Sequence, residues 1–238
     1  PRDFSNAPLQ TEPSIAVNPN DPDHLVMGSI DYNFPNVTNY VSIDGGVTWE
    51  GPFRPPYLAE DIGSGGDAVV AFDRDGNVYI IFISIGVEEF TVGPAADQAV
   101  VSSIAISKSE NGGRTWNEPV SSFRSGISKN LSPGPNGQLQ GDIAISFLDK
   151  PWLGIGPSKE DPSIDAIYVT MTEFTERFPI IFPFGGNFPF FGVPVLETAI
   201  KVVSSTDGGQ TWSESATASP VVRRIFASGG SSEEDING

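Results

Sequence analysis

Ser42-Ile43-Asp44-Gly45-Gly46-Val47-Thr48-Trp49 is the first of three copies of one phrase, and the other two span residues 109–116 and 205–212. Each copy reads Ser-x-Asp/Asn-x-Gly-x-Thr-Trp and follows a short run that favours a β-strand. A phrase that returns along a chain indicates a repeated structural unit, so we expect an array of similar pieces.

The chemistry of the phrase is that of a tight turn. Its Gly-Gly centre tolerates positive φ, and the Asp or Asn side chain accepts hydrogen bonds from its own loop. The Trp that follows is a large apolar anchor beside neighbouring strands. We therefore assign structural roles, and no chemistry on a substrate, to Asp44, Trp49, Asn111, Trp116, Asp207 and Trp212.

The three copies divide the chain into units of four short strands. The units cover approximately residues 11–51, 67–120 and 149–215, while residues 216–238 begin a further unit or form a tail. Four short antiparallel strands per unit favour an all-β fold, a β-propeller rather than a sandwich, and no window has helical periodicity. Propellers typically have about four to eight blades. Three blades are therefore part of a ring, and we expect a second chain or a missing half to complete it.

The phrase resembles the Asp-box, also called the bacterial neuraminidase repeat, of the sialidase superfamily of β-propellers. The middle copy departs from the pattern by carrying Asn111, and segments that begin at Glu12, Asp67 and Asp149 are also similar to that superfamily. The likeness covers about residues 11–220. It implies a six-bladed ring, of which this chain would supply half.

The resemblance also suggests where a sialidase-type site would lie. Sialidases hold a carboxylate with three Arg and use a Tyr nucleophile helped by Glu, with an Asp acid/base; the planar guanidinium suits this task because it binds a carboxylate in bidentate fashion. No Arg-Ile-Pro signature precedes the first Asp-box, so these catalytic roles do not transfer. The residues of suitable type on the loops opposite the Asp-boxes are Arg54, Arg124, Arg224, Tyr57 and Asp61.

Carboxylates gather at two predicted places, where calcium is the cofactor to consider. The turn 73–77 has some likeness to a calcium loop, but it lacks the bidentate Glu and reads as a hairpin turn. Glu12, Asp67 and Asp149 open the innermost strands and should ring a central channel. There they bind a cation, pair with Lys150 or an Arg, or cap strand ends. The metal candidates are Asp73, Asp75, Asp67 and Asp149.

The segment 174–195 is rich in Phe, Pro and Gly, which excludes a helix or a central strand. An exposed apolar hairpin of this kind either packs over a neighbouring blade or forms an interaction surface. It lies among the long loops at 31–39, 51–66, 84–99, 121–148 and 173–197, opposite the Asp-boxes. The binding candidates are Phe184, Phe188, Phe190, Phe191 and Arg177.

Composition narrows the function classes. Thirty acidic against 13 basic residues give a net charge of −17, which argues against nucleic-acid binding. The chain has no Cys and no apolar stretch long enough for a membrane helix. We favour an extracellular or cell-surface propeller that acts as a binding or assembly module for a protein partner or glycan. The alternatives are a sialidase-type glycoside hydrolase and a cation-stabilised structural protein of an envelope or filament.

Overall fold

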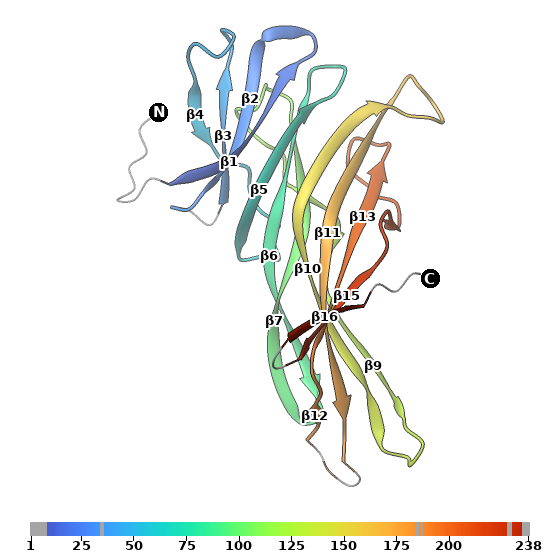
Figure 1. Ribbon diagram of the computed structural model, residues 1–238. Helices are drawn as coiled ribbons and strands as arrows, with labels where there is room; N and C mark the ends of the chain where they lie inside the picture. Colours follow the sequence, from blue (N-terminus) through green and yellow to red (C-terminus); the bar gives the residue numbers. More distant parts are fainter. Residues whose placement is uncertain (1–8, 34–35, 184–185, 187, 228–229, 235–238) are drawn as a thin grey trace.

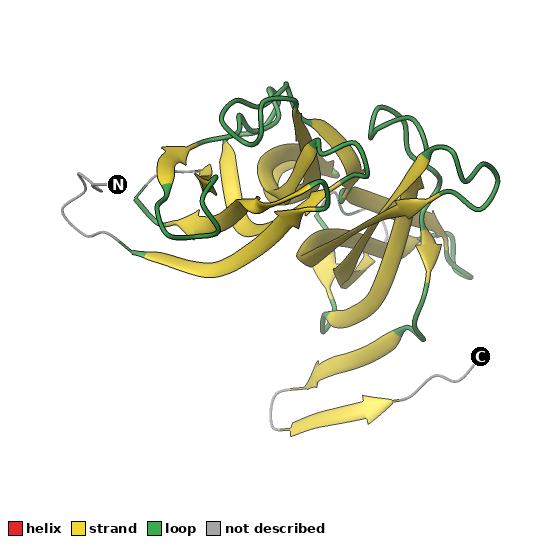
Figure 2. Ribbon diagram, turned by 90° about the horizontal axis from the view of Figure 1, so that it is seen from above, coloured by secondary structure: helices red, strands yellow, loops and turns green. Residues whose placement is uncertain are grey.

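The computed structural model describes residues 9–33, 36–183, 186, 188–227 and 230–234. Within these ranges every regular element is a β-strand, as the sequence predicts. The strands form three antiparallel sheets that follow one another along the chain (Figure 1). Seen from above, the sheets stand in an open row (Figure 2). No helix in the described part of the chain is long and apolar enough to cross a membrane.

The first two sheets are four-stranded blades with strands in sequence order. Blade 1 consists of β1 (Gln10–Asn18), β2 (Asp21–Asp31), β3 (Asn36–Ser42) and β4 (Glu50–Phe53). Blade 2 consists of β5 (Gly63–Phe72), β6 (Val78–Val92), β7 (Ala95–Ser109) and β8 (Val120–Arg124). Both have the up-and-down order that radial repetition predicts, which confirms the propeller fold class.

The third sheet contains a four-stranded blade and further strands that pair beyond the blade. Blade 3 consists of β10 (Leu139–Pro157), β11 (Asp165–Ile181), β13 (Val195–Ser205) and β14 (Ala216–Thr217). The long strands β10, β11 and β13 continue beyond the blade, where they pair with β9 (Ile127–Pro133), β12 (Phe190–Phe191) and β15 (Val222–Ala227). β15 in turn pairs with β16 (Gly230–Glu234). We call this continuation the extension; it lies at the lower end of Figure 1. Residues 222–227 and 230–234 therefore enlarge the third sheet.

Several segments that the sequence indicates as long loops are strands instead. β6 and β7 stay paired from Val78 and Ser109 to Val92 and Ala95, so most of 84–99 is a hairpin. Residues 127–133, 139–148 and 173–181 pair in the extension in the same way. The prediction that Phe and Pro exclude a central strand from 174 onward was wrong for 174–181.

Pro179 shows why a strand tolerates proline there. The amide of Gly192 donates to the carbonyl oxygen of Pro179 at 2.7 Å, so the nitrogen of Pro179 faces that same edge of β11. Pairing with β13 ends at Arg177, two residues earlier. The N–H that proline lacks therefore removes no bond to β13, and the loss is confined to one bond of the Pro179–Gly192 pair.

Two apolar clusters join the blades. The cluster between blades 1 and 2 includes Val26, Val41, Ile80 and Phe82, and the one between blades 2 and 3 includes Ile81, Ile104, Val169 and Met171. Neighbours in β6 alternate between the two clusters because successive side chains point to opposite faces. Burial of each large aliphatic side chain contributes about 1.5–3 kcal/mol, so blade 2 is held on both faces.

The Asp-boxes form the turns that the sequence predicts. In the first, Asp44 accepts hydrogen bonds from Ser42 Oγ at 2.8 Å, Thr48 N at 2.8 Å and Thr48 Oγ1 at 2.5 Å, and Trp49 Nε1 donates to Gly46 O at 3.1 Å. The third repeats these contacts around Asp207 and Trp212. The hydrogen bond from the Thr211 side chain is the main reason that the pKa of Asp207 falls to about 2.

The second Asp-box also ties its blade to the preceding one. Trp116 Nε1 donates to Asn39 Oδ1 at 2.8 Å, and Asn39 Nδ2 donates to Gly113 O at 2.7 Å. His24 Nε2 lies 3.1 Å from Gly112 O, which can only accept, so the ring donates there. The single histidine of the chain thus has a structural partner in the next blade.

Candidate functional site

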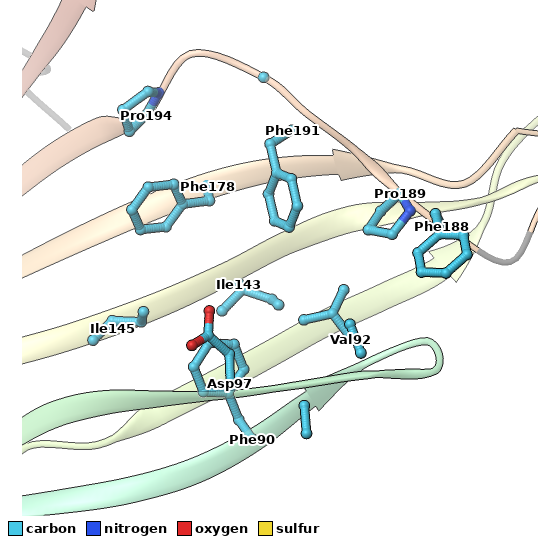
Figure 3. Close-up of a pocket in the computed structure, with 13 residues that line it drawn as sticks. Phe90, Val92, Asp97, Ile143, Ile145, Phe178, Phe188, Pro189, Phe191 and Pro194 are labelled. Atoms are coloured by element: carbon cyan, nitrogen blue, oxygen red, sulfur yellow. The ribbon is translucent and has the colours of Figure 1, made fainter.

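An apolar pocket lies where the β6–β7 hairpin of blade 2 meets the extension. Its volume is about 590 Å³, within the range of about 300–1,000 Å³ usual for ligand pockets. Figure 3 shows Phe178 and Phe191 on one side of the hollow and Phe90, Val92 and Asp97 on the other, with Ile143 between them. The remaining described lining residues are Ala95, Ala96, Ile145, Phe188, Pro189, Gly192 and Pro194.

Strand register places the aromatic wall. Phe191 pairs with Ile180, which is buried, whereas Phe190 pairs with Ile181, which is exposed. Successive strand residues face opposite sides, so Phe191 lines the pocket and Phe190 does not. Phe188 and Phe191 are nevertheless 68% and 58% exposed, and such large apolar side chains carry a solvation cost that a ligand would remove.

A small core supports the pocket floor. Val92, Ile143, Ile180 and Phe182 are buried together, and Phe90 packs against them. Lys129 Nζ also donates to the carbonyl oxygen of Thr91 at 3.2 Å across the same junction. The floor is therefore held independently of the two larger clusters between the blades.

Asp97 is the one charged side chain among the described residues that line this pocket. Its Oδ1 accepts the backbone N–H of Gln98 at 2.8 Å, and the side chain stays exposed. In register it stands opposite Phe90 on the β6–β7 hairpin. The pocket therefore presents apolar surface with one anionic group.

The predicted binding residues separate into three groups. Phe188 and Phe191 line the pocket, and Phe190 lies beside it on the other face of β12. Arg177 faces away from the pocket, where its guanidinium pairs with Asp142 at 2.6 Å and Glu197 at 3.2 Å. Phe184 lies outside the described residues.

Sequence reasoning missed the other half of the pocket. Phe90, Val92, Ile143 and Ile145 belong to segments that the sequence indicates as loops. A signal was present, since Ile143-Ala144-Ile145 is a short apolar run rich in β-branched residues, which is consistent with a buried strand.

A second cavity, of about 390 Å³, lies along the innermost strands of the three blades. Glu12, Asp67 and Lys150 each have positive φ, at 52°, 55° and 48°, and each marks a register shift in its strand. The bulge is thus repeated once per blade. Because these residues lie within β1, β5 and β10, the prediction that the acidic residues open the strands was wrong, and Lys150 rather than Asp149 occupies the equivalent third position.

The bulges bring unlike charges together. Lys150 Nζ lies 3.3 Å from Glu12 Oε2, and Lys150 N donates to Asp67 Oδ2 at 3.2 Å and to Asp149 Oδ1 at 2.9 Å. Burial, with the nearby charges of Glu12 and Asp149 in support, raises the pKa of Asp67 to about 6. The ammonium of Lys150 pairs with Glu12, and the backbone N–H of Lys150 serves Asp67 and Asp149.

The other metal candidates belong to a closed turn. Asp73 accepts hydrogen bonds from the amides of Asp75 and Asn77 at 3.0 and 2.8 Å, and Gly76 supplies positive φ. This is the hairpin turn that the Asp-Gly sequence favours. The described residues contain no group of three or more His, Cys, Asp or Glu side chains arranged to hold a metal ion.

The arginines proposed for a carboxylate grip lie on separate sheets. Arg54, just after β4, pairs with Asp31 at 3.4 Å, and Arg124, at the end of β8, pairs with Asp61 at 2.8 Å and Glu88 at 3.2 Å. Arg224 lies on β15 of the extension, and Tyr57 packs against the cluster between blades 1 and 2. None of these residues lines the cavity along the innermost strands.

Comparisons with known proteins bear on the fold. The family model of the BNR/Asp-box repeat matches residues 203–214, which contain the whole third Asp-box. A search of curated proteins finds no match.

Solved structures similar to this chain include the Hadza microbial sialidase Hz136, at 14% identity and a TM-score of 0.37; the alignment covers 87% of this chain and 58% of that one. A protein of unknown function from Dyadobacter fermentans has 13% identity and a TM-score of 0.31, over 90% of this chain and 74% of its own. The Trypanosoma rangeli sialidase in complex with the inhibitor DANA has 15% identity and a TM-score of 0.30, over 87% and 37%.

The chain thus spans less than two thirds of either sialidase's length. At these scores the likeness says nothing about the activity of this chain, and its own repeats and sheets carry the assignment. The three Asp-boxes and three consecutive four-stranded blades make this chain a partial β-propeller with Asp-box repeats.

Proposed function

We propose that this chain is a recognition module that holds an apolar segment of a protein partner in the pocket between the β6–β7 hairpin and the extension. The observation that carries the proposal is the exposed aromatic wall, with Phe188 and Phe191 left largely open to solvent above a supported apolar floor. Exposed apolar surface of this kind, gathered in one concave place, typically marks an interaction site.

The chemistry of the pocket favours a protein segment over a glycan. Sugars need several hydrogen-bonding groups beside an aromatic face, and this pocket offers Phe, Ile, Val and Pro with the single carboxylate of Asp97. Phe has no polar handle, unlike the Trp and Tyr usual in sugar sites. A glycan is therefore the weaker of the two partners foreseen from the sequence.

Charge further limits the partner. The chain carries a net charge of −17, and Asp97 sets a negative group beside the apolar walls. A segment with Phe or Leu side chains and a neighbouring Lys or Arg fits both properties, and opposite charge speeds its encounter with the pocket. An extracellular or cell-surface setting belongs to the same proposal, and fractionation of the source cells tests it.

Selection of a random nonapeptide phage library on the immobilised chain tests the proposal. We expect enrichment of peptides that combine aromatic or aliphatic residues with a basic one. A synthetic peptide of the consensus sequence, followed by fluorescence anisotropy, should bind Phe191→Ala about tenfold more weakly than the unmodified chain, as loss of an aromatic anchor predicts.

Phe190→Ala is the matched control because Phe190 is adjacent, of the same type and also largely exposed, at 71% against 58% for Phe191, yet does not line the pocket. Its affinity should stay within about twofold. No enrichment, or a peptide that distinguishes neither variant, would overturn the proposal. Binding of sialyllactose or a chito-oligosaccharide that Phe191→Ala weakens would replace the protein segment by a glycan.

The hydrolase and the cation-stabilised structural protein stay predictions. For the first, Arg54 and Arg124 already hold carboxylates of the chain itself, so a substrate carboxylate would have to displace Asp31 or Asp61. Turnover of a fluorogenic sialoside tests it. For the second, a melting temperature that rises with calcium is the sign to seek, since a ligand specific to the native state raises apparent stability.

A further inference from the structure

The β6–β7 hairpin runs past the two strands that flank it in blade 2. β5 pairs with β6 as far as Ile85, and β8 pairs with β7 as far as Ser103. β6 and β7 continue to pair with each other through residues 86–101, which we call the overhang. A pair of strands that overhangs its sheet has two edges, and each edge presents backbone N–H and C=O groups on which another chain can pair.

Hydrogen bonds at the base of the overhang show which groups of β7 point away from β6. The amide of Ser102 donates to Ser125 Oγ at 2.8 Å, and its carbonyl oxygen accepts the amide of Ser125 at 2.8 Å. Successive residues of a strand direct these groups to opposite sides, and the β6–β7 pairing has no register shift. Ala96, Gln98 and Val100 therefore also direct their N–H and C=O groups away from β6.

Most of these outward groups lack a partner within the described chain. Asp97 Oδ1 accepts the amide of Gln98 at 2.8 Å, and no other hydrogen bond between described residues reaches an outward group of residues 96–100. Residues 95–101 include three alanines and contain no Lys, Pro or register shift, the usual devices that protect an edge. The edge of β7 is therefore open to a further strand.

The other edge of the overhang differs. The carbonyl oxygen of Ile85 accepts the amide of Ile62 at 2.8 Å, so Ile85 and every second residue after it, Val87 and Thr91 included, direct their backbone groups away from β7. Lys129 Nζ donates to the carbonyl oxygen of Thr91 at 3.2 Å. A lysine at a sheet edge discourages pairing, so this edge is protected where that of β7 is not.

The open edge borders the apolar pocket. Lys129, which contacts the β6 edge, belongs to β9 at one side of the extension, whereas Phe191 belongs to β12 at the other side. Ala96 and Asp97 of β7 line the pocket together with Phe191 (Figure 3). β7 is therefore the strand of the hairpin on the side of the aromatic wall. A strand paired with β7 would lie across the mouth of the pocket.

We propose that the partner segment binds as a β-strand added to the edge of β7, where its backbone pairs with Ala96, Gln98 and Val100 while every second side chain enters the pocket. This inference rests on the proposed function, because the occupant is the same apolar segment. Strand addition takes affinity from main-chain hydrogen bonds and specificity from pockets for alternate side chains. The overhang supplies the first and the aromatic wall supplies the second.

This binding mode fixes the pattern of the partner sequence. The outward groups of residues 96–100 extend over about five positions, a span of about 17 Å at about 3.4 Å per residue. The segment therefore carries apolar side chains, aromatic or β-branched, at alternate positions on its pocket face. Its Lys or Arg lies beside Asp97. A ligand bound as a helix would instead show apolar residues at spacings of three and four.

A scan of backbone N-methylation on the selected peptide tests the proposal with the unmodified chain. Each variant peptide carries one N-methyl group, and its affinity is measured by fluorescence anisotropy. In an added strand only alternate amides face β7, so N-methylation of these should weaken binding about tenfold, whereas the intervening amides should tolerate it within about twofold. Losses that do not alternate, or a consensus sequence with helical spacing, would overturn strand addition.

Proline substitution tests the same contact from the side of the chain. Val100→Pro removes an outward N–H of β7 without removing a bond to β6, and it should weaken the unmodified peptide about tenfold. Val87→Pro is the matched control, because Val87 pairs with Val100 and is similarly exposed, at 42% against 52%, but directs its N–H to the other edge. Its affinity should stay within about twofold. Circular dichroism checks that both variants fold, and equal losses in the two folded variants would contradict the proposal.

The outcomes separate this inference from the proposed function on which it rests. A peptide that Phe191→Ala weakens, but whose N-methylated forms show no alternation, would leave the pocket in place and remove strand addition. If no peptide is selected, both fall. If Val100→Pro does not fold, the N-methylation scan decides by itself, since it leaves the chain unchanged.

Discussion

The Asp-box end of the molecule and the extension end use the same strands in different ways. At the Asp-box end, Ser, Thr, Gly and an Asp or Asn close each turn with hydrogen bonds made within eight residues, and the second and third turns pack on the preceding blade. At the other end, β6, β7, β10 and β11 run on past their blades and enclose a pocket with exposed Phe side chains.

The difference between the two ends indicates which of them has side chains left to contact a ligand. A turn whose polar groups are all paired within the fold has nothing left to offer a ligand. The extension keeps apolar surface open above a supported floor, a condition that costs stability unless a partner covers it. Function on a rigid repeated scaffold is thus expected at the end that departs from the repeat.

Replacement of a turn glycine by alanine should lower the free energy of unfolding much more at the Asp-box end than in the extension, and this is the largest difference that we expect between the two ends. Gly113→Ala places a carbon against Val26 and Val41 at a φ of +90°, so strain and overpacking together should cost about 4 kcal/mol. Gly137→Ala, in the extension turn, has a φ of +78° and nothing within 4 Å, so strain alone should cost about 1 kcal/mol. Urea unfolding measures both, and equal losses would remove the distinction between the ends.

Truncation of the pocket floor should weaken one end and spare the other. Ile143 is 2% exposed in the small core, so Ile143→Ala should cost about 3 kcal/mol through lost burial and a residual cavity. Amide hydrogen exchange should quicken in β9 and in residues 87–97, while the Asp-box amides keep their protection. Uniform loss of protection over the whole chain would show that the extension is not a separate unit.

The local pattern predicted the Asp-box end but not the pocket. The Asp-box is readable because Ser42, Asp44 and Thr48 meet within one turn, and the family repeat is recognisable from those same residues. The pocket joins Phe90, Ile143 and Phe191, which are far apart in sequence and come together by long-range strand pairing. The rule that proline ends a strand failed at Pro179 because that residue lies where its neighbour β13 has already ended.

The repeat also allowed two of the residues at the cavity along the innermost strands to be predicted from the sequence. Glu12 and Asp67 do meet there, since each belongs to a repeated inner strand. The choice of Asp149 over Lys150 as their counterpart depended on register, and a shift of one residue turns a side chain to the other face. The amino-acid composition of this segment does not indicate whether Asp149 or Lys150 occupies the bulge.

The smallest expected effect is the pH dependence of stability that Asp67 contributes. Its pKa is raised from 3.8 to about 6 on folding, so its neutral form favours the fold below about pH 4 and this contribution fades as pH rises through 6. Because the side chain is partly exposed and therefore screened, the loss should amount to about 1 kcal/mol. Asp67→Asn, which mimics the neutral form, should remove that slope in urea unfolding between pH 4 and 7.

Asp207 gives the opposite slope and serves as the control. Its pKa is lowered to about 2, so its contribution is present above pH 4 and disappears as pH falls toward 2. Asp207→Asn should therefore change acid unfolding and leave the pH 4 to 7 range as it is. A difference between Asp67→Asn and the unmodified chain that does not vary with pH would contradict the account of the inner-strand bulges.

Hydrogen exchange with and without the selected peptide, resolved along the chain, tests most directly whether the non-repeating end performs recognition. Protection on binding should concentrate in residues 90–97, 143–145 and 188–192, with the amides of the three Asp-boxes unchanged. Protection centred on the inner strands near Asp67, or on Arg54 and Arg124, would contradict it.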